Sequence, residues 1–241
     1  MIVGEEEITI KKLYLILMKH QFGNAKECKT LIKHHKVMIN DVIMDDPDYI
    51  VEENDKIRVN GLPINSHPFI YYMMNKPKGY ICANKDQIHR CVIDLIDKKD
   101  CFCIGRLDKD TTGLLLITND SSLMKKLLLP NRHVKKTYLV EVNNILKREL
   151  VDLFQQGVVI DRKKLCLPAY LEIIDDVHCY VTIYEGRYHQ IKKMFLSCGY
   201  QVVELKRINF AGIALNDSLH EGQYRCLHQK ELQILKKQML Q

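Results

Sequence analysis

The sequence predicts an α+β protein made of two parts of unequal size, and three observations support this. Short stretches that alternate apolar and polar residues, typical of half-buried strands, are interspersed with stretches of helical periodicity. A turn-rich segment at residues 62–68 contains two prolines and marks a linker. The 241 residues, of which 46% are hydrophobic, are enough for one large core and one small core. We therefore predict a small domain over residues 1–61 and a large domain over residues 69–241.

Charge is unevenly divided between the two parts. Residues 1–61 hold nine Lys and Arg against eleven Asp and Glu, whereas the remaining residues hold 27 against 19. A basic large domain suits a polyanionic partner. No apolar run approaches the roughly 18 residues that cross a bilayer, and the acidic first seven residues are unlike a secretory signal. We expect a cytoplasmic protein without a membrane segment, with its nine cysteines reduced and mostly in the core.

The small domain is predicted to contain two helices followed by a hairpin. Residues 8–18 form the first helix, and Asn24 with Glu27 fits a capping box that opens a second helix ending near His35. Strands follow at residues 37–39 and 57–59. The second helix carries basic residues on one face. Such a face is commonly solvated surface, but its concentration of positive charge within an acidic segment favours contact with phosphates from Lys26, Lys29, Lys33 and Lys36.

The large domain is predicted to alternate strands with helices. Pro130 ends one helix and Gly157 caps another. The expected strands are residues 69–75, 101–104, 114–117, 135–142, 179–185 and 203–207, and the expected helices are residues 121–129, 146–156 and 229–239. Residues 185–195 are expected to turn from strand into a further helix, which Gly199 closes.

A polar loop beginning at Gly105 is the strongest candidate for chemistry. It holds Arg106, Asp108 and Asp110, and the apolar run that follows it is short enough to be a strand buried on both faces. Polar loops anchored on rigid strands are common places for functional groups. The same features also fit a charged surface hairpin whose glycines merely permit positive φ.

The loop and two later stretches resemble the RsuA family of RNA pseudouridine synthases. Gly-Arg-Leu-Asp at residues 105–108, followed by Thr-x-Gly-Leu-Leu-Leu, is similar to motif one and implies that Asp108 is catalytic. Lys-x-Tyr-Leu-Val at residues 136–140 is similar to motif two and implies that Tyr138, otherwise an ordinary core residue, stacks on the target base. Residues 185–195 are similar to motif three and imply that Lys192 pairs with Asp108 and that Arg187 contacts RNA.

The resemblance extends to both ends of the chain. The small domain is similar to the S-four-type RNA-binding domain, named after a ribosomal protein, although the usual Arg-Leu-Asp of its first helix is here Lys-Leu-Tyr at residues 12–14, and the usual Ser-Arg is Asn-Ala-Lys at residues 24–26. His189 lacks a carboxylate or cysteine at metal-ligand spacing and is expected to pack or to form hydrogen bonds. Toward the C-terminus the family signature is matched by Leu205, Arg207, Gly212, Leu215, Leu219, Gly222, Arg225, Leu227 and Glu231.

This resemblance implies an isomerase that converts uridine to pseudouridine in ribosomal RNA, most simply small-subunit (16S) RNA, without cofactor or metal. It also implies a mixed, mostly antiparallel sheet whose RNA cleft holds Asp108, a ribosomal RNA or assembly intermediate as partner, and a monomer. An aspartate with a pKa near ~3.9 in water would be neutralised by burial alone, so a cation such as Lys192 is needed to keep it charged. Arg106, two residues away, would hold a phosphate of the flipped nucleotide.

Three other functions remain compatible with the residues alone. The same reaction could act on large-subunit RNA. A non-catalytic RNA-binding assembly factor would need no carboxylate in a cleft facing a polyanion. Finally, residues 108–112 fit Asp-x-Asp-x-Thr, the first motif of magnesium-dependent haloacid-dehalogenase-type phosphatases, with Asp175 and Asp176 as a later metal pair. There, however, Arg106 intervenes between the motif and the preceding strand.

Overall fold

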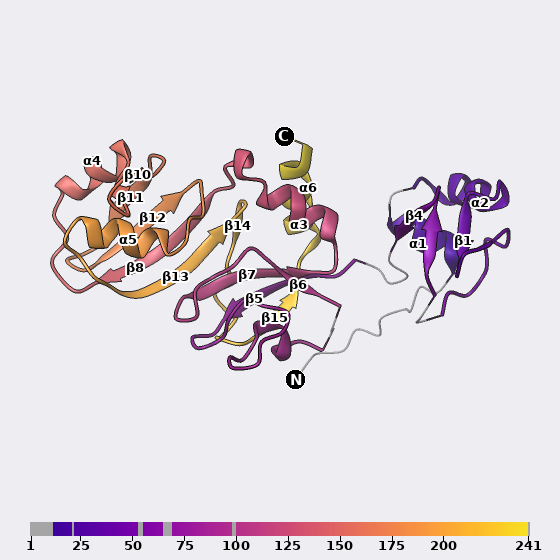
Figure 1. Ribbon diagram of the computed structural model, residues 1–241, viewed down its shortest axis with the longest axis horizontal. Coiled ribbons are helices and arrows are strands. Elements are labelled where there is room, and N and C mark those ends of the chain that lie inside the picture. The colour runs from indigo at the N-terminus through magenta and orange to yellow at the C-terminus, as the bar shows by residue number, and fades with distance from the viewer. Residues whose placement is uncertain (1–11, 21, 53–54, 65–68, 98–99, 241) are drawn as a thin grey trace. The chain divides into compact units, whose positions relative to one another are not determined.

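The computed structural model divides into two compact units, with the boundary between Phe69 and Ile70 (Figure 1). The structure describes residues 12–20, 22–52, 55–64, 69–97 and 100–240. Each unit has its own hydrophobic core and is described by itself below.

The first unit packs two helices against a four-stranded antiparallel sheet of order β2-β1-β3-β4. The predicted capping box is present: the Asn24 side chain accepts a hydrogen bond from the Glu27 N–H at 3.0 Å, and Glu27 accepts one from the Asn24 N–H at 2.7 Å. Leu13, Leu17 and Ile32 are completely buried between helices and sheet. The elements are α1 (Leu13–Lys19), α2 (Ala25–Lys33), β1 (Val37–Ile39), β2 (Val42–Ile43), β3 (Ile57–Val59) and β4 (Leu62–Ile64).

The predicted linker over residues 62–68 is wrong at its start. Leu62–Ile64 forms β4, which pairs antiparallel with β3. Asn60 and Gly61 join the two strands with φ of 49° and 78°, the left-handed conformation that a two-residue hairpin turn requires and that Asn-Gly supplies most readily. Residues 65–68 lie outside the described residues. The first helix begins at Leu13. Residues 8–11, which were expected in this helix, lie outside the described residues.

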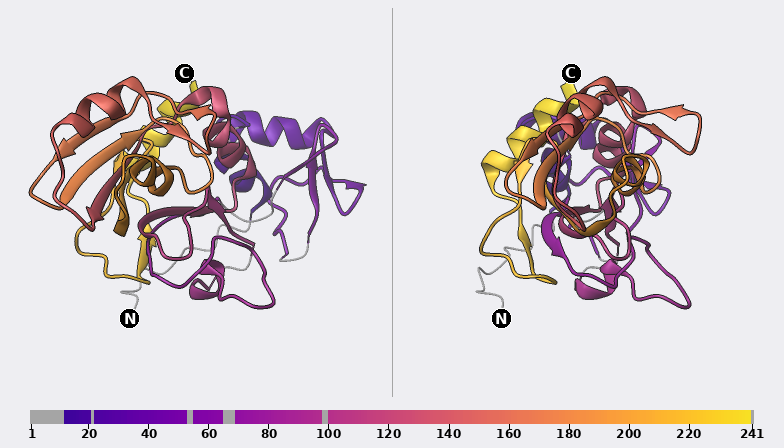
Figure 2. Two further views of the ribbon diagram at one scale, coloured as in Figure 1. Left: turned by 60° about the vertical axis from the view of Figure 1, so that its left-hand side comes forward. Right: turned by 90° about the vertical axis from the view of Figure 1, so that its left-hand side faces the viewer.

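A nine-stranded mixed sheet organises the second unit, as predicted. The strands run in the order β11-β12-β8-β13-β7-β5-β15, with β14 beside β13 and β6 beside β7. Most of these strands are labelled in Figure 1, and Figure 2 shows the same ribbon from two further directions. Among the described strand pairs of this sheet, only β13 and β7 are parallel. The strands are β5 (Tyr71–Lys76), β6 (Phe102–Ile104), β7 (Thr112–Thr118), β8 (Lys136–Val142), β11 (Tyr170–Ile173), β12 (His178–Ile183), β13 (Val202–Phe210), β14 (Ile213–Ala214) and β15 (Tyr224–Cys226).

Helices cover the two halves of this sheet separately. Phe154 of α4 and Phe195 of α5 enter one core with β8, β11, β12 and β13, while Leu127 of α3 and Leu235 of α6 enter another with β5 and β7. All seven residues of β7 are buried, as expected of a strand covered on both faces. The remaining elements are η1 (Val92–Leu95), α3 (Ser121–Leu128), η2 (Pro130–Arg132), α4 (Glu149–Gln156), β9 (Val159–Ile160), β10 (Lys164–Leu165), α5 (Gln190–Ser197) and α6 (Gln229–Leu240).

No helix within the described residues is long and apolar enough to span a membrane.

The two halves of the sheet meet at the short parallel pairing of β7 with β13, where Gly113 lies opposite Arg207. Gly113 has a φ of +98°, and a Cβ placed on it would lie 2.3 Å from the Arg207 carbonyl oxygen and 2.7 Å from its nitrogen. Both atoms belong to the backbone, so neither can move aside as a side chain would. Glycine is therefore required for the two strands to approach this closely.

We predict that Gly113→Ala lowers the free energy of unfolding by about 3 to 5 kcal/mol, because positive-φ strain adds to a backbone clash. Gly199→Ala is the matched control: its φ is +84°, but no heavy atom lies within 4 Å of the added Cβ. The control should lose only about 1 to 2 kcal/mol. Urea denaturation of both variants measures the difference, and equal losses would show that the close approach at Gly113 is not a constraint.

Candidate active site

A cavity of about 590 Å³ opens beside the loop that precedes β7. Its walls come from that loop, from β8 and β13, and from the start of α5. Five of the predicted site residues line it together although they come from three separate stretches of the chain. These residues are Arg106, Asp108, Tyr138, Arg187 and Lys192.

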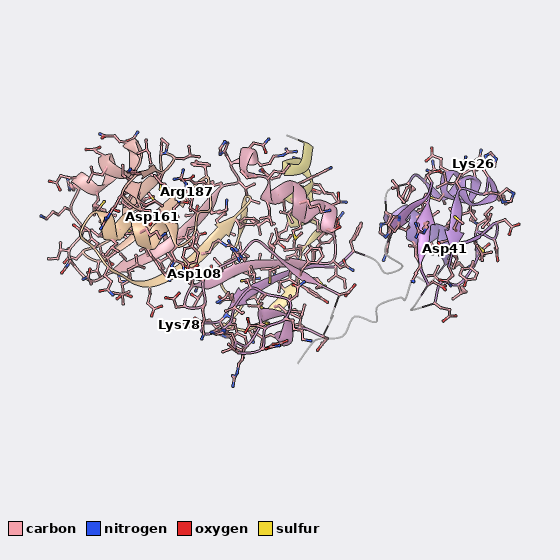
Figure 3. The ribbon with its side chains drawn as sticks, viewed as in Figure 1. Lys26, Asp41, Lys78, Asp108, Asp161 and Arg187 are labelled. Carbon is pink, nitrogen blue, oxygen red and sulfur yellow. The ribbon has the colours of Figure 1, made fainter. Side chains whose placement is uncertain are left out.

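Asp108, labelled in Figure 3, lines this cavity, and two basic side chains lie near its carboxylate. Its Oδ2 is 3.4 Å from the Lys192 Nζ, and its Oδ1 is 3.6 Å from the His189 Nε2. The Asp108 side chain is 26% exposed, so water and substrate can reach it. His189 adopts the left-handed conformation, with φ of 51°, immediately before α5 begins. The kink directs both His189 and the first turn of α5 to the carboxylate.

Lys192 contacts a second carboxylate more closely than the first. Its Nζ donates a hydrogen bond to the Asp110 Oδ1 at 2.5 Å. Burial acts to raise the pKa of Asp110, but the hydrogen bond and charge of Lys192 outweigh it, so this pKa lies below its usual value. Asp110 therefore stays ionised and keeps Lys192 beside Asp108. The sequence indicated Asp110 as part of the polar loop and of the Asp-x-Asp-x-Thr pattern, but not as a partner of Lys192.

Tyr138 lies on β8 with only 7% of its surface exposed. It faces Arg207 across the β8–β13 register. Burial raises the pKa of Tyr138, while the charge of Arg207 and a hydrogen bond from it act in the opposite direction. The phenol is thus neutral and held beside a cation.

Arg207 is itself 1% exposed and lines the cavity. Its Nε donates to the Leu114 carbonyl at 2.7 Å, while its buried Nη2 has no hydrogen-bond partner within the described part of the chain. Sequence reasoning identified Arg207 only as a signature position. Its alternation with Leu205, which places an arginine on the same face of a strand as a core leucine, is the signal that could have indicated a buried functional cation.

Lys76, at the end of β5, forms hydrogen bonds with the loop that carries Asp108. The sequence analysis did not identify it as a site residue. It is fully buried, and its Nζ donates to the carbonyl oxygens of Pro77 at 3.0 Å, Lys109 at 3.3 Å and Thr111 at 2.8 Å. Burial lowers the pKa of Lys76, opposed in part by nearby negative charge that includes Asp108. Two of the three carbonyls belong to the loop, so this single side chain fixes the loop's path. The signal available was a lysine at the end of an expected strand, separated from the apolar residues of that strand by Asn75.

The predicted RNA-binding residues occupy two different settings. Arg106 is exposed at the cavity, and its side chain makes no hydrogen bond or ion pair that the described residues provide. The Arg187 Nε donates to the Glu185 Oε2 at 2.9 Å. The lysines of α2, and Lys36 shortly after it, belong to the first unit. Lys29 lies over the Tyr14 ring at 4.4 Å, while Lys26 (Figure 3), Lys33 and Lys36 are exposed.

The arrangement does not favour the phosphatase hypothesis. Asp175 accepts hydrogen bonds from the N–H groups of Val177 and His178 and shapes the turn between β11 and β12. Neither Asp175 nor Asp176 lines the cavity. Between Asp108 and Asp110 lies the ammonium group of Lys192, where the hypothesis requires a metal ion. Within the part of the chain that the structure describes, no group of three or more His, Cys, Asp or Glu is placed to hold a metal.

Comparison with known proteins agrees with this geometry. Residues 70–197 match the RNA pseudouridylate synthase family. The chain is 37% identical to an uncharacterized RNA pseudouridine synthase, YtzG, of Bacillus subtilis (strain 168) over 93% of this chain and 98% of that protein. The chain belongs to the RNA pseudouridylate synthase family. It is 35% identical to ribosomal small subunit pseudouridine synthase A of Escherichia coli (strain K12), over 83% of this chain and 89% of that protein.

A solved structure supports the same assignment over both units. The crystal structure of a pseudouridylate synthase superimposes with a TM-score of 0.68 at 31% sequence identity, covering 93% of this chain and 99% of that one. The resemblance predicted from the three motifs is therefore confirmed, and the protein is an RNA pseudouridine synthase, an isomerase. Neither the phosphatase nor the idle RNA-binding protein is favoured.

Lys136 gives the synthase cavity a cation whose charge depends on pH. It lines the cavity, and its Nζ donates to the Val134 carbonyl at 2.7 Å. Burial and then the charge of Arg207 lower the pKa of Lys136 to about 8, with Glu185 acting in the opposite direction. Between about pH 8 and the ordinary lysine pKa, the unfolded chain thus binds a proton that the folded chain has released.

We predict that the wild-type protein gains stability relative to Lys136→Met as pH rises above about 8. Below this pH the lysine is charged in both states and the full burial penalty is present; above it the folded lysine is neutral and the penalty is relieved. The difference should change by no more than about 1.4 kcal/mol per pH unit. Urea denaturation of both proteins at pH 7 and pH 9.5 measures it. A difference that is the same at both pH values would exclude a depressed pKa.

Proposed function

We propose that this enzyme converts a uridine of small-subunit ribosomal RNA to pseudouridine, with Asp108 as the reacting carboxylate. The observation that carries the proposal is the placement of Asp108 in a cavity beside Lys192, at 3.4 Å, together with a buried tyrosine. The relatives named as small-subunit synthases, at 34% to 35% identity, support the choice of RNA. In the reaction the bond between N1 and C1′ breaks, a bond between C5 and C1′ forms, and the C5 proton is replaced by one on N1. Atoms and electrons balance without a co-reactant.

Asp108 is proposed to react at the sugar from a position between Lys192 and His189. The Lys192 Nζ lies 3.4 Å from one carboxylate oxygen and the His189 Nε2 lies 3.6 Å from the other. Both side chains line the same cavity as Asp108, so the carboxylate is held where a flipped uridine would lie.

A uridine must leave its helix or loop to reach Asp108, and unstacking costs a few kcal/mol. The cavity volume of about 590 Å³ lies in the range of small-ligand sites and accommodates a flipped nucleotide. Stacking of the flipped base on Tyr138 would offset part of this cost, by roughly 1–3 kcal/mol. Arg106 and Arg187, at the same cavity, would bind phosphates on either side of the flipped nucleotide. We also propose that the enzyme acts as a monomer.

The first unit is proposed to be an S-four-type RNA-binding domain spanning residues up to Ile64. Its α2 carries Lys26, Lys29 and Lys33, spaced three and four residues apart, so they share one face, and Lys26 and Lys33 are exposed. Phosphate contacts of this kind add affinity without sequence information. The domain would hold the ribosomal RNA while the second unit selects the uridine.

We predict that replacing Lys26, Lys33 and Lys36 together by Ala weakens RNA binding and reduces its dependence on salt. Removing a single phosphate contact lowers the slope of log K against log salt by roughly 0.7 to 0.9, so the slope should fall by about 2 to 3. Removing the exposed Lys230, Lys236 and Lys237 from the region of α6 takes away the same charge and serves as control. Equal slopes for the two triple variants, measured by fluorescence anisotropy, would argue against docking through α2.

We predict that cells lacking the gene lose one pseudouridine from small-subunit RNA, and that the wild-type gene restores it while Asp108→Asn does not. The amide of the variant is isosteric but carries no charge to react. Carbodiimide adducts read by primer extension across both ribosomal RNAs and transfer RNA measure the outcome. Loss in large-subunit RNA would overturn the proposed substrate, and restoration by Asp108→Asn would overturn the role of Asp108.

A further inference from the structure

Tyr188 is an exposed aromatic residue next to the active site that the proposed reaction leaves unused. It is 69% exposed, whereas most tyrosines of the second unit are more covered. Its ring stacks on the His189 ring with centroids 3.8 Å apart and planes 22° from parallel. His189 lines the cavity and its Nε2 is 3.6 Å from the Asp108 Oδ1, while Tyr188 does not line the cavity. Tyr188 is thus one ring removed from Asp108, outside the cavity.

The surroundings of Tyr188 suit a nucleic acid strand. The Lys193 Nζ lies 5.2 Å from the Tyr188 ring centroid and is held by the Asp161 Oδ2 at 2.9 Å. Arg187 precedes Tyr188 directly and lines the cavity. Single-stranded RNA is bound by a combination of aromatic faces for its bases and cations for its phosphates. Both are present here within a short stretch of the chain.

Exposure alone would not distinguish Tyr188 from an ordinary surface tyrosine. Tyr170, for example, is 60% exposed on β11, yet it stacks on no neighbouring ring that the structure records and does not line the cavity. The ring of Tyr188 is instead fixed against an imidazole whose other contact is the proposed reacting carboxylate. A fixed ring loses little conformational entropy when it binds, which favours recognition.

We propose that Tyr188 is a stacking platform for the base next to the target uridine. This inference rests on the proposed function, because it places the flipped uridine in the cavity and its neighbour on the strand at the cavity mouth. Stacking tolerates any base, since each presents a π-face. The platform therefore contributes affinity for an unpaired neighbour and a preference for loops and single strands over duplex RNA.

The first test uses the absence of tryptophan from the chain. Tyr188→Trp introduces the only tryptophan of the chain, and stacking of a nucleobase quenches tryptophan emission. Ribosomal RNA from cells lacking the gene is the titrant, and Tyr170→Trp is the control, which also corrects for light absorbed by the RNA. We expect saturable quenching for Trp at position 188 and none at position 170 after correction. Equal responses at both positions would overturn the platform.

The second test measures turnover on the same RNA by tritium release from 5-tritiated uridine. Tyr188→Leu should raise KM about 5- to 150-fold with little change in kcat, whereas Tyr188→Phe, which keeps the ring, and Tyr170→Leu should match the wild type. A fall in kcat without a change in KM would mean that Tyr188 only supports His189, and would overturn the platform. If the wild type releases no tritium, the proposed function fails instead, while the fluorescence titration still reports on stacking.

Discussion

The active site depends on one buried ammonium group. Lys76 brings its charge into the sheet interior, where an unpaired charge would be strongly unfavourable, and three backbone carbonyls surround it. Two of these carbonyls, those of Lys109 and Thr111, lie on either side of Asp110 and shortly after Asp108 in the chain. Lys76 therefore binds the loop to β5 close to both carboxylates. A loop of this length would otherwise sample many conformations. Here its path is set by a fully buried amino group whose hydrogen bonds to these carbonyls water cannot replace.

The junction of β7 with β13 supplies the other half of the positioning. Gly113 lets the strands approach, and Arg207 lies opposite both Gly113 on one side and Tyr138 on the other. The loop carrying Asp108 enters β7 just before this point, and α5 precedes β13 in the chain. The carboxylate, the tyrosine and the basic helix start are therefore set relative to one another by a few backbone pairings. A shift of one residue in either register would turn Tyr138 or Arg207 to the opposite face.

Local patterns in the sequence were sufficient for the elements whose burial repeats regularly. The alternation in β8 predicted that Tyr138 faces inward, and the unbroken apolar run of β7 predicted a strand buried on both faces. The motifs brought Asp108 and Lys192 into one hypothesis. The roles that could not be predicted depend on long-range contacts. Lys76 binds carbonyls more than thirty residues away, and Arg207 depends on a neighbour in another strand. Strand β4 could have been predicted from local sequence, because Asn60-Gly61 is a typical hairpin turn. Pro63 was instead interpreted as part of a linker.

The division of Lys192 between two carboxylates bears on how Asp108 can react. A hydrogen bond of 2.5 Å to Asp110 is short, whereas 3.4 Å to Asp108 is beyond the usual range for a strong N–H···O bond. Asp110 thus takes the directional bond and determines where Lys192 lies, while Asp108 receives mainly the field of the charge. A carboxylate tightly bound by a cation is a weak nucleophile or base, and an isolated one in a closed site becomes protonated. In the observed geometry the Lys192 ammonium is anchored on Asp110 and lies near Asp108 without forming a short bond to it.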